Sequence, residues 1–285
     1  DLMSTAHYYL TAVLLRRLAL ALGEDEEAQR LAADAAEIGA AFHAEFYRGP
    51  GVGYGSGNQA CNAVALYLGL APPAVVEDTV AVLVADVRAR GDHLTTGNLC
   101  TKYLLEVLAE HGHADLALAL VTQTEYPSWG YMLAQGATTI WERWEHATGG
   151  GMNSHNHPMY ASVGAWFYRR LAGLQVPADA VGLSRVVVRP PLDLALGRAA
   201  AELATGRGVL SVAWRRDGDE AVVDVRLPVG VRADVSLPAG WEFTAPGERG
   251  RPGGERPAAD WPDDGAARRL DDGEHRLTAC RARPD

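Results

Sequence analysis

Apolar residues recur at helical spacing through most of the first 178 residues of the chain. The first such segment extends to Leu22, with Ser4 or Thr5 placed to cap its helix and Gly23 placed to end it. Two more helices are predicted on either side of Gly112. The other predicted helices cover residues 24–47, 58–70, 74–90 and 160–173.

The connections between these helices alternate between tight turns and longer polar loops. This rhythm is typical of an array of α-hairpins or of a helical toroid, in which one set of loops gathers at one face. The loop over residues 48–59 contains five glycines, but no strand precedes it and no Lys-Ser or Lys-Thr pair ends it. We therefore interpret it as a loop between helices and not as a phosphate site. A second loop carries His93, Thr95 and Thr96, whose polar groups serve a turn or reach a sugar.

From Leu183 onward apolar residues alternate with charged ones, which is the period of a β-strand. Five strands are expected, in the stretches SRVVVRP, GVLSVAWRR, EAVVDVRLP, VRADVSLP and EHRLTACRA. We predict a helical-hairpin domain over residues 1–178, followed by an antiparallel β-sandwich over residues 179–285. Residues 245–266 are expected to form a long loop. Trp214 and Trp261 are expected to pack inward or shield the linker, in preference to stacking on a sugar.

The charge balance narrows the class of ligand. The formal net charge of −10 and the isoelectric point of about 5.4 argue against nucleic acid as the main partner, because phosphate binding needs clustered lysine and arginine.

The most apolar run contains Arg16 and Arg17, so we expect no membrane segment. Three cysteines without short spacing fit neither a disulfide framework nor a zinc site, and they favour a reducing compartment, here the cytoplasm.

The stretch GATTIWERWEHATGGGMNSHNHPMY, residues 136–160, concentrates groups that suit a sugar site. Five consecutive residues supply two indoles, two carboxylates and a guanidinium, and the residues after the three glycines add amides and imidazoles that recognise vicinal hydroxyls. Trp129 lies upstream, where stacking on a sugar ring and packing in the core are alternatives of equal weight. We interpret the stretch as the lip of a sugar-sized pocket. Its candidate residues are Trp141, Glu142, Arg143, Trp144, Asn156 and His157.

Glu142 is the candidate catalytic group. The neighbouring indoles would raise the pKa of its carboxyl group by desolvation, whereas the guanidinium of Arg143 would keep it charged. A charged carboxylate that faces a water molecule in a largely apolar pocket can act as the general base of an inverting glycoside hydrolase. The alternative is a buried structural Glu-Arg pair. Glu145 is the next candidate, as a supporting partner or a surface charge.

Two histidine pairs, His155 with His157 and His111 with His113, raise the question of a metal site. Neither pair has a third ligand at a useful spacing, so we expect no metal. No Ser-His-Asp or Cys-His grouping is evident, which leaves the carboxylates as the candidate chemistry.

At this point the sequence resembles a known family, the bacterial α-L-rhamnosidases of glycoside hydrolase family 78. The segment YPSWGYMLAQGATTIWE, followed by MNSHNH and a helix, is similar to the catalytic-domain motif of that family. The segments YGSGNQACNAVALYLGL and GDHLTTGNLCTKYLLEVLAEHG also resemble family segments, in the right order. The β-rich part from Arg185 resembles the family's C-terminal sandwich, so the resemblance covers nearly the whole chain.

The resemblance implies an (α/α)6 six-hairpin toroid and cofactor-free hydrolysis, with inversion, of terminal α-L-rhamnose on glycosides or polysaccharides. Glu142 matches the general base and His157 a position that contacts the rhamnose hydroxyls, while Trp141 and Trp144 would line the site. The family usually has Phe where this chain has His155, a departure at the rim of the site.

The family's general acid lies in an upstream Asp-x-x-x-Glu-Arg-x-Gly-Trp stretch that this sequence does not contain. About eight helices are predicted before the sandwich, fewer than the twelve of a closed toroid. We therefore expect an N-terminally truncated catalytic domain with little or no activity alone and with apolar helix faces exposed at its open edge. The alternatives are a non-catalytic carbohydrate-binding or scaffold module, or another six-hairpin glycosidase or phosphorylase.

Overall fold

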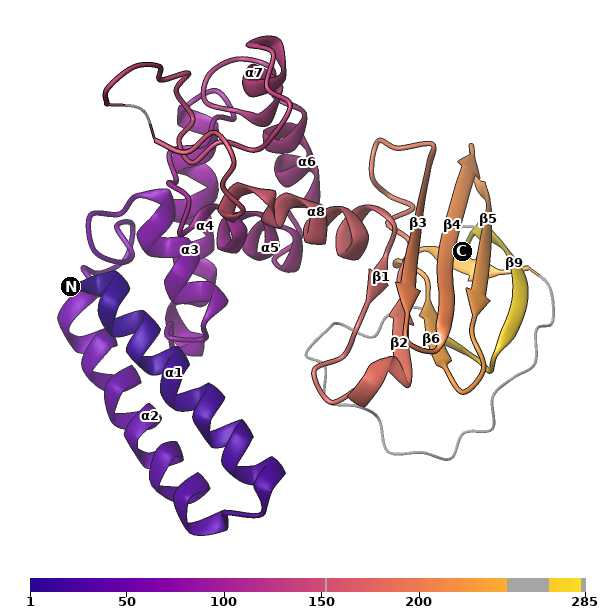
Figure 1. Ribbon diagram of the computed structural model, residues 1–285, viewed down its shortest axis with the longest axis horizontal. Coiled ribbons are helices and arrows are strands. Elements are labelled where there is room, and N and C mark those ends of the chain that lie inside the picture. Colours follow the sequence, from indigo (N-terminus) through magenta and orange to yellow (C-terminus); the bar gives the residue numbers. More distant parts are fainter. Residues whose placement is uncertain (152, 245–266, 283–285) are drawn as a thin grey trace. The chain divides into compact units, whose positions relative to one another are not determined.

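The computed structural model describes residues 1–151, 153–244 and 267–282, and its ribbon is drawn in Figure 1. The chain divides into two compact units, Asp1–Val163 and Gly164–Asp285. The first unit is helical and the second is built from β-strands, so the predicted fold class, helical hairpins followed by β-sheets, is confirmed. The boundary that we place at residue 178 stays a prediction.

The predicted helices are present, with ends that differ by a few residues. They are α1 Leu2–Leu22, α2 Asp25–Phe46, α3 Gln59–Tyr67, α4 Pro73–Ala89, α5 Thr101–Glu110 and α6 Ala114–Thr122. A short further helix that the pattern did not predict, α7, covers Trp129–Ala134. The helix predicted over residues 160–173 is a run of three types: 3-10 turns at Met159–Ser162, the α-helix α8 at Val163–Trp166, and a π-helical turn at Phe167–Leu171.

The start of α1 differs from the prediction. Asp1, and neither Ser4 nor Thr5, occupies the N-cap position, and the Thr5 hydroxyl lies within the helix, where it donates to the Asp1 carbonyl at 3.1 Å. A threonine in the first turn bonds back to the preceding turn once helix extends to its N-terminal side. The predicted end is confirmed, because Gly23 adopts φ 76° and donates to the Ala19 and Leu20 carbonyls.

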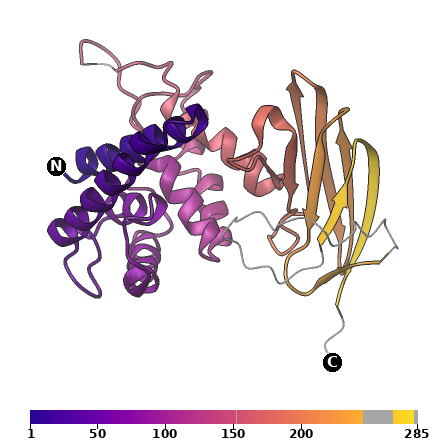
Figure 2. The ribbon, with the colours of Figure 1, turned by 90° about the horizontal axis from the view of Figure 1, so that it is seen from below.

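Helices α1 and α2 form an antiparallel hairpin, visible from two sides in Figures 1 and 2. One small buried cluster of this hairpin consists of Ala19, Ala28 and Leu31. Large apolar side chains on α1 remain exposed, which agrees with the expectation of an uncovered apolar helix face. These side chains are Tyr8, Leu14, Leu15, Leu18, Leu20 and Leu22.

The glycine-rich loop between α2 and α3 is held by its own hydrogen bonds. The Asn62 side chain accepts from the Tyr54 amide at 2.8 Å and donates to the Gly57 carbonyl at 3.0 Å. The Tyr54 hydroxyl lies 2.8 Å from Nδ1 of His43 on α2. These polar groups therefore fasten the loop to the helices on either side of it, as the interpretation as an inter-helix loop predicts.

The second unit is a sandwich of two sheets. One has four strands in the order β1-β2-β6-β8, and the other has five in the order β3-β4-β5-β9-β7. The five predicted strands correspond to β2 Arg185–Val188, β4 Gly208–Asp217, β5 Glu220–Leu227, β6 Arg232–Ser236 and β9 Gly273–Arg281. Four strands were not predicted, namely β1 Leu174–Gln175, β3 Arg198–Thr205, β7 Trp241–Phe243 and β8 Ala267–Leu270. The pairing is antiparallel except between β2 and β6, which are parallel.

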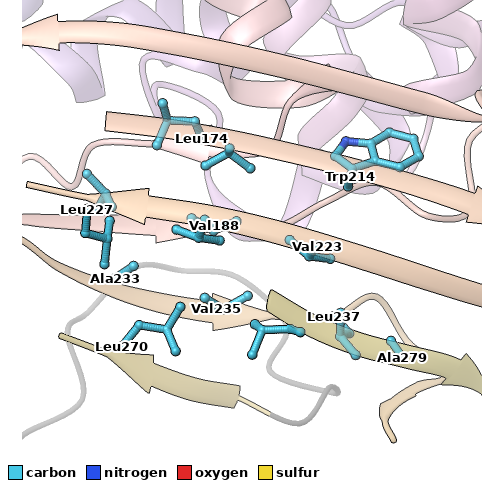
Figure 3. Packing of buried hydrophobic residues seen from close by; sticks show 14 of the residues in the cluster. Leu174, Val188, Trp214, Val223, Leu227, Ala233, Val235, Leu237, Leu270 and Ala279 are labelled. Atoms are coloured by element: carbon cyan, nitrogen blue, oxygen red, sulfur yellow. The ribbon is translucent and has the colours of Figure 1, made fainter. Parts of the chain in front are cut away.

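The core of the sandwich lies between the two sheets, as Figure 3 shows. Val223 on β5 and Val235 on β6 contribute fully buried side chains from opposite sheets. Trp214 on β4 is also buried, and its indole donates to the Leu171 carbonyl at 2.8 Å, which confirms inward packing for this tryptophan. Trp261 and the loop predicted over residues 245–266 lie outside the described residues.

Gly173 provides a test of backbone crowding in the second unit. It has φ 78°, and a Cβ atom added to it would lie 2.3 Å from the Arg189 carbonyl oxygen. We expect Gly173→Ala to lower the free energy of unfolding by more than about 1 kcal/mol, because it adds this clash to the cost of a left-handed alanine. Gly240→Ala is the control, since Gly240 has φ 75° but open space around it. Urea unfolding that shows equal losses for the two variants would contradict the expected clash.

Candidate active site

The candidate site is built on two arms of chain that run alongside each other, residues 139–142 and 154–157. The Glu142 amide donates to the Ser154 carbonyl at 2.9 Å, and the His157 amide donates to the Ile140 carbonyl at 2.8 Å. The Thr139 hydroxyl donates to the His155 carbonyl. The three predicted groups at Trp141, Glu142 and His157 are therefore brought together by backbone pairing, with the glycines of the motif in the loop between the arms.

The Glu142 carboxylate is half-buried and is held by the opposite arm. Its Oε2 accepts from the Ser154 amide at 2.9 Å, and Oε1 is in no hydrogen bond with another described residue. The alternative of a buried Glu142–Arg143 pair is not found among the described residues, because Arg143 is exposed and no ion pair joins the two. One carboxylate oxygen is thus fixed by a backbone donor, and the other has no such partner among the described residues.

Trp141 is buried and stacks on two neighbouring imidazoles, whose own rings lie 5.8 Å apart. Its ring lies 4.8 Å from that of His146 and 5.0 Å from that of His155, both in stacked orientation. His155 Nε2 lies 2.9 Å from the Ala147 carbonyl oxygen, so this imidazole also ties the second arm to the chain that follows the tryptophans. The sequence predicted His155 at the rim, and the structure shows that it holds both Trp141 and the loop.

Trp144 and Trp129 form an aromatic cluster with Tyr160. The Trp144 ring stacks on that of Tyr160 at 3.9 Å and meets that of Trp129 edge-on at 5.1 Å. The indole N–H of Trp144 donates to the Thr96 carbonyl, and that of Trp129 to the Tyr160 carbonyl. Only 6% of Trp144 and 8% of Trp129 is exposed, so both support the motif from within. Their contact with a substrate stays a prediction.

The tyrosines beside this cluster are electrostatically linked to Glu145. Burial raises the pKa of Tyr160 well above its usual range, and the nearby Glu145 carboxylate adds to the effect. The pKa of Tyr126 is raised in the same way, by burial first and then by Glu145. Both hydroxyls stay protonated at neutral pH and can act as hydrogen-bond donors, while Glu145 itself is exposed.

Asn156 and His157 end the second arm. The Asn156 side chain is exposed, and the backbone N–H of Asn156 donates to the Ser154 hydroxyl at 3.0 Å. The half-buried His157 accepts from the Met159 amide through Nδ1 at 3.4 Å. An exposed side-chain amide and an imidazole carry donors and acceptors of the kind that bind sugar hydroxyls, and their contact with a sugar stays a prediction.

A buried glutamine that the sequence analysis missed positions the loop under Trp144. Gln59, at the start of α3, donates to the His93 carbonyl at 3.0 Å and accepts from the Thr95 amide at 2.9 Å. The Thr96 hydroxyl lies 2.8 Å from that of Thr101, and its carbonyl receives the Trp144 indole. The loop that carries His93, Thr95 and Thr96 thus supports the motif. Gln59 could have been found in the sequence as a polar residue at the start of an otherwise apolar helix.

Outside this cluster the described residues present two hollows but no metal site. Among the described residues no group of three His, Cys, Asp or Glu side chains is placed to hold a metal ion. No helix of the described chain combines the length and hydropathy needed to cross a membrane. Two shallow hollows lie on the five-stranded sheet of the second unit, and neither is lined by a residue of the candidate site.

The tie between His155 and Ala147 can be tested by substitution. We expect His155→Phe to keep the stacking on Trp141 but to lose the hydrogen bond to the Ala147 carbonyl, at a cost of about 1 kcal/mol. His155→Ala should lose both and be about 2 kcal/mol or more less stable than the parent. Hydrogen exchange of the amides at residues 142 and 157 would report the loosening of the arms, and equal protection in all three proteins would contradict the role given to His155.

Comparison with known proteins places these features in a family. Residues 1–171 match the model of the bacterial alpha-L-rhamnosidase 6 hairpin glycosidase domain, and residues 173–251 match that of the bacterial alpha-L-rhamnosidase C-terminal domain. An alpha-L-rhamnosidase of Streptomyces avermitilis is 35% identical over 245 residues, 84% of this chain and 23% of that protein. One from an Alteromonas species is 34% identical over 254 residues, 86% of this chain and 27% of that protein. The chain thus spans about a quarter of the length of these relatives.

Solved structures agree with these sequence matches. The structure of Streptomyces avermitilis alpha-L-rhamnosidase complexed with L-rhamnose superposes with a TM-score of 0.84 at 32% identity, over 98% of this chain and 26% of that one. The alpha-L-rhamnosidase of Dictyoglumus thermophilum superposes with a TM-score of 0.83 at 28% identity, over 97% of this chain and 31% of that one. Both units of the chain therefore have counterparts in these proteins.

Proposed function

The chain belongs to the family of bacterial α-L-rhamnosidases, and we propose that it carries the general base for hydrolysis of terminal α-L-rhamnose with inversion. The observation that carries this proposal is the Glu142 carboxylate, which the Ser154 amide holds by Oε2 while Oε1 is in no hydrogen bond with another described residue. It lies in the segment that matches the six-hairpin glycosidase model. The proposed general acid lies outside these 285 residues.

In the proposed reaction, Oε1 of Glu142 removes a proton from a water molecule as the water oxygen attacks the anomeric carbon of rhamnose. The bond from that carbon to the glycosidic oxygen breaks, and its electron pair stays on the leaving oxygen. The general acid protonates that oxygen, so that the products are β-L-rhamnose and the free alcohol. The bond from the Ser154 amide limits the motion of the Glu142 carboxylate.

The substrate class rests on the relatives. One related structure contains L-rhamnose, and the relatives compared above are named alpha-L-rhamnosidases. We assign the Asn156 amide and the His157 imidazole to the rhamnose hydroxyls, and the exposed Arg143 to the rim of the site. Trp141, which stacks on two neighbouring imidazoles, supplies the wall beside Glu142. No cofactor has a role in this scheme.

The proposal is tested with p-nitrophenyl α-L-rhamnoside and two proteins, the present chain and a chain extended upstream to complete the helical ring. We expect hydrolysis by the extended chain and little or none by the present one, because an inverting enzyme needs both carboxyl groups. Nuclear magnetic resonance of the first product should show the β-anomer. Folded proteins that are both inactive would contradict the rhamnosidase assignment and favour a non-catalytic sugar-binding module.

A further inference from the structure

The open face of the five-stranded sheet carries a groove with an unusual arrangement of charges. In an antiparallel sheet, residues directly opposite each other point to the same face. The registers therefore define three rows of outward side chains across β3, β4, β5 and β9. The first row is Arg198, Arg215, Val222 and Thr278; the second is Ala200, Ala213, Asp224 and Arg276; the third is Glu202, Ser211, Arg226 and Glu274.

The second row forms the floor of the groove, because Ala200 and Ala213 have short side chains between longer ones. Two hollows of about 330 Å³ and 500 Å³ lie here and share Ala213 and Asp224 in their walls. Both volumes fall in the range of about 300–1,000 Å³ that is usual for small-molecule sites. The first and third rows are four residues apart along each strand, or about 14 Å. The groove is thus long enough for a short saccharide.

The first row holds two adjacent guanidinium groups, and the exposed Asp217 and Glu220 form the next row beyond them on the same face. Arg198 and Arg215 are paired directly across β3 and β4, and both are exposed. Like charges in this position destabilise a sheet unless an anion lies between them. Among the described residues neither guanidinium has an acidic partner. Asp224, in the second row, is already bound by Arg276 through both oxygens, at 2.6 Å and 3.2 Å.

The rest of the groove is lined by polar groups of mixed charge. Asp224 and Glu274 offer acceptors for hydroxyl groups, and Ser211 offers both a donor and an acceptor. The 3.8 Å contact between Arg226 and Glu274 balances the charge at this end. A ligand that fits this pattern has a planar anionic group at one end, for the two guanidinium forks, and several hydroxyls along its length.

We propose that this groove is an accessory binding site for an acidic oligosaccharide, with a uronic acid carboxylate bound between Arg198 and Arg215. The choice of a saccharide among carboxylate ligands rests on the proposed function. The site would hold an acidic polysaccharide on the second unit, separately from the rhamnose-binding residues around Glu142.

The test is calorimetric titration of the 285-residue chain with α-1,4-linked trigalacturonic acid and with its methyl ester, which keeps the shape and removes the charge. We expect the acid to bind about tenfold or more tightly than the ester, and its binding to weaken with added salt. Arg198→Gln combined with Arg215→Gln should lower the affinity for the acid about tenfold or more. The matched control, Arg16→Gln with Arg232→Gln, removes the same charge elsewhere and should leave the affinity unchanged.

A second variant, Ala213→Gln, fills the floor without changing any charge and should also weaken binding, provided that circular dichroism shows the parent fold. The proposal is overturned if the acid does not bind at millimolar concentration, if the ester binds equally well, or if the arginine variant binds like its control. Equal binding of inorganic sulfate would identify a simple anion site and also overturn it. The trisaccharide contains no rhamnose, and the titration measures no hydrolysis. A negative titration therefore leaves the proposal for Glu142 unaffected. Inactivity toward p-nitrophenyl α-L-rhamnoside likewise leaves the result of the titration unaffected.

Discussion

Glu142→Gln, introduced into the upstream-extended chain, is expected to lower kcat for p-nitrophenyl α-L-rhamnoside by about 10³-fold. The amide is nearly the same size and can still accept from the Ser154 amide, so the arms should stay paired. It cannot, however, take a proton from water. KM should change little, because the substitution removes a group that acts on the water and not one that binds the sugar.

Two controls separate this chemistry from a disturbed fold. Glu145→Gln changes an exposed carboxylate three residues along and should retain activity within a few fold. Azide should restore turnover in Glu142→Gln and give the β-rhamnosyl azide, since an anionic nucleophile needs no base. A Glu142→Gln enzyme with more than a tenth of the parent kcat, or one that azide does not restore, would reject Glu142 as the general base.

Trp144→Ala is expected to cause the largest loss of stability, about 3–5 kcal/mol. The indole is buried against the rings of Tyr160 and Trp129, and its N–H satisfies the Thr96 carbonyl. The substitution leaves a cavity and removes the shorter of two hydrogen bonds to the buried Thr96 carbonyl, so that only the 3.5 Å bond from the Thr101 hydroxyl remains. Urea unfolding of the 285-residue chain, followed by circular dichroism at 222 nm, reports mainly the helical unit.

Trp144→Phe divides this loss into its parts. It keeps most of the ring contact and removes the hydrogen bond, so it should cost about 1–3 kcal/mol. Tyr8→Ala, which removes an exposed ring on α1, should change the free energy of unfolding by about 0.5 kcal/mol or less. If Trp144→Ala were no more destabilising than Tyr8→Ala, the aromatic cluster would have no supporting role and its rings would be available to a ligand.

The helices and the longer strands could be predicted because their patterns are local. The helical spacing of apolar residues predicts α2 and α4, and the alternation of apolar with polar residues predicts β4 and β5. Strand β3 was missed because its side chains are mainly alanine, so alternation of large apolar and polar residues is absent. The parallel pairing of β2 with β6 depends on a contact between distant segments, which no local pattern encodes.

The candidate site, like the fold, could be predicted from the sequence only in part. The sequence identified Glu142 because it stands among indoles beside a guanidinium, but it did not identify what holds the carboxylate. That partner is the backbone amide of Ser154, twelve residues away. Every residue except proline has a backbone N–H, so the residue type at position 154 does not indicate this bond. Gln59 was missed for a related reason, because its two partners belong to a loop more than thirty residues further along the chain.

The order of strands in the larger sheet has a consequence for biosynthesis. Strand β9 lies between β5 and β7, although both precede it in the chain. Until β9 has left the ribosome, β7 has no partner in its sheet and β5 is an unprotected edge. The helical unit can therefore assemble during translation, whereas the sandwich must wait for its last strand and is the part that chaperones would have to shield.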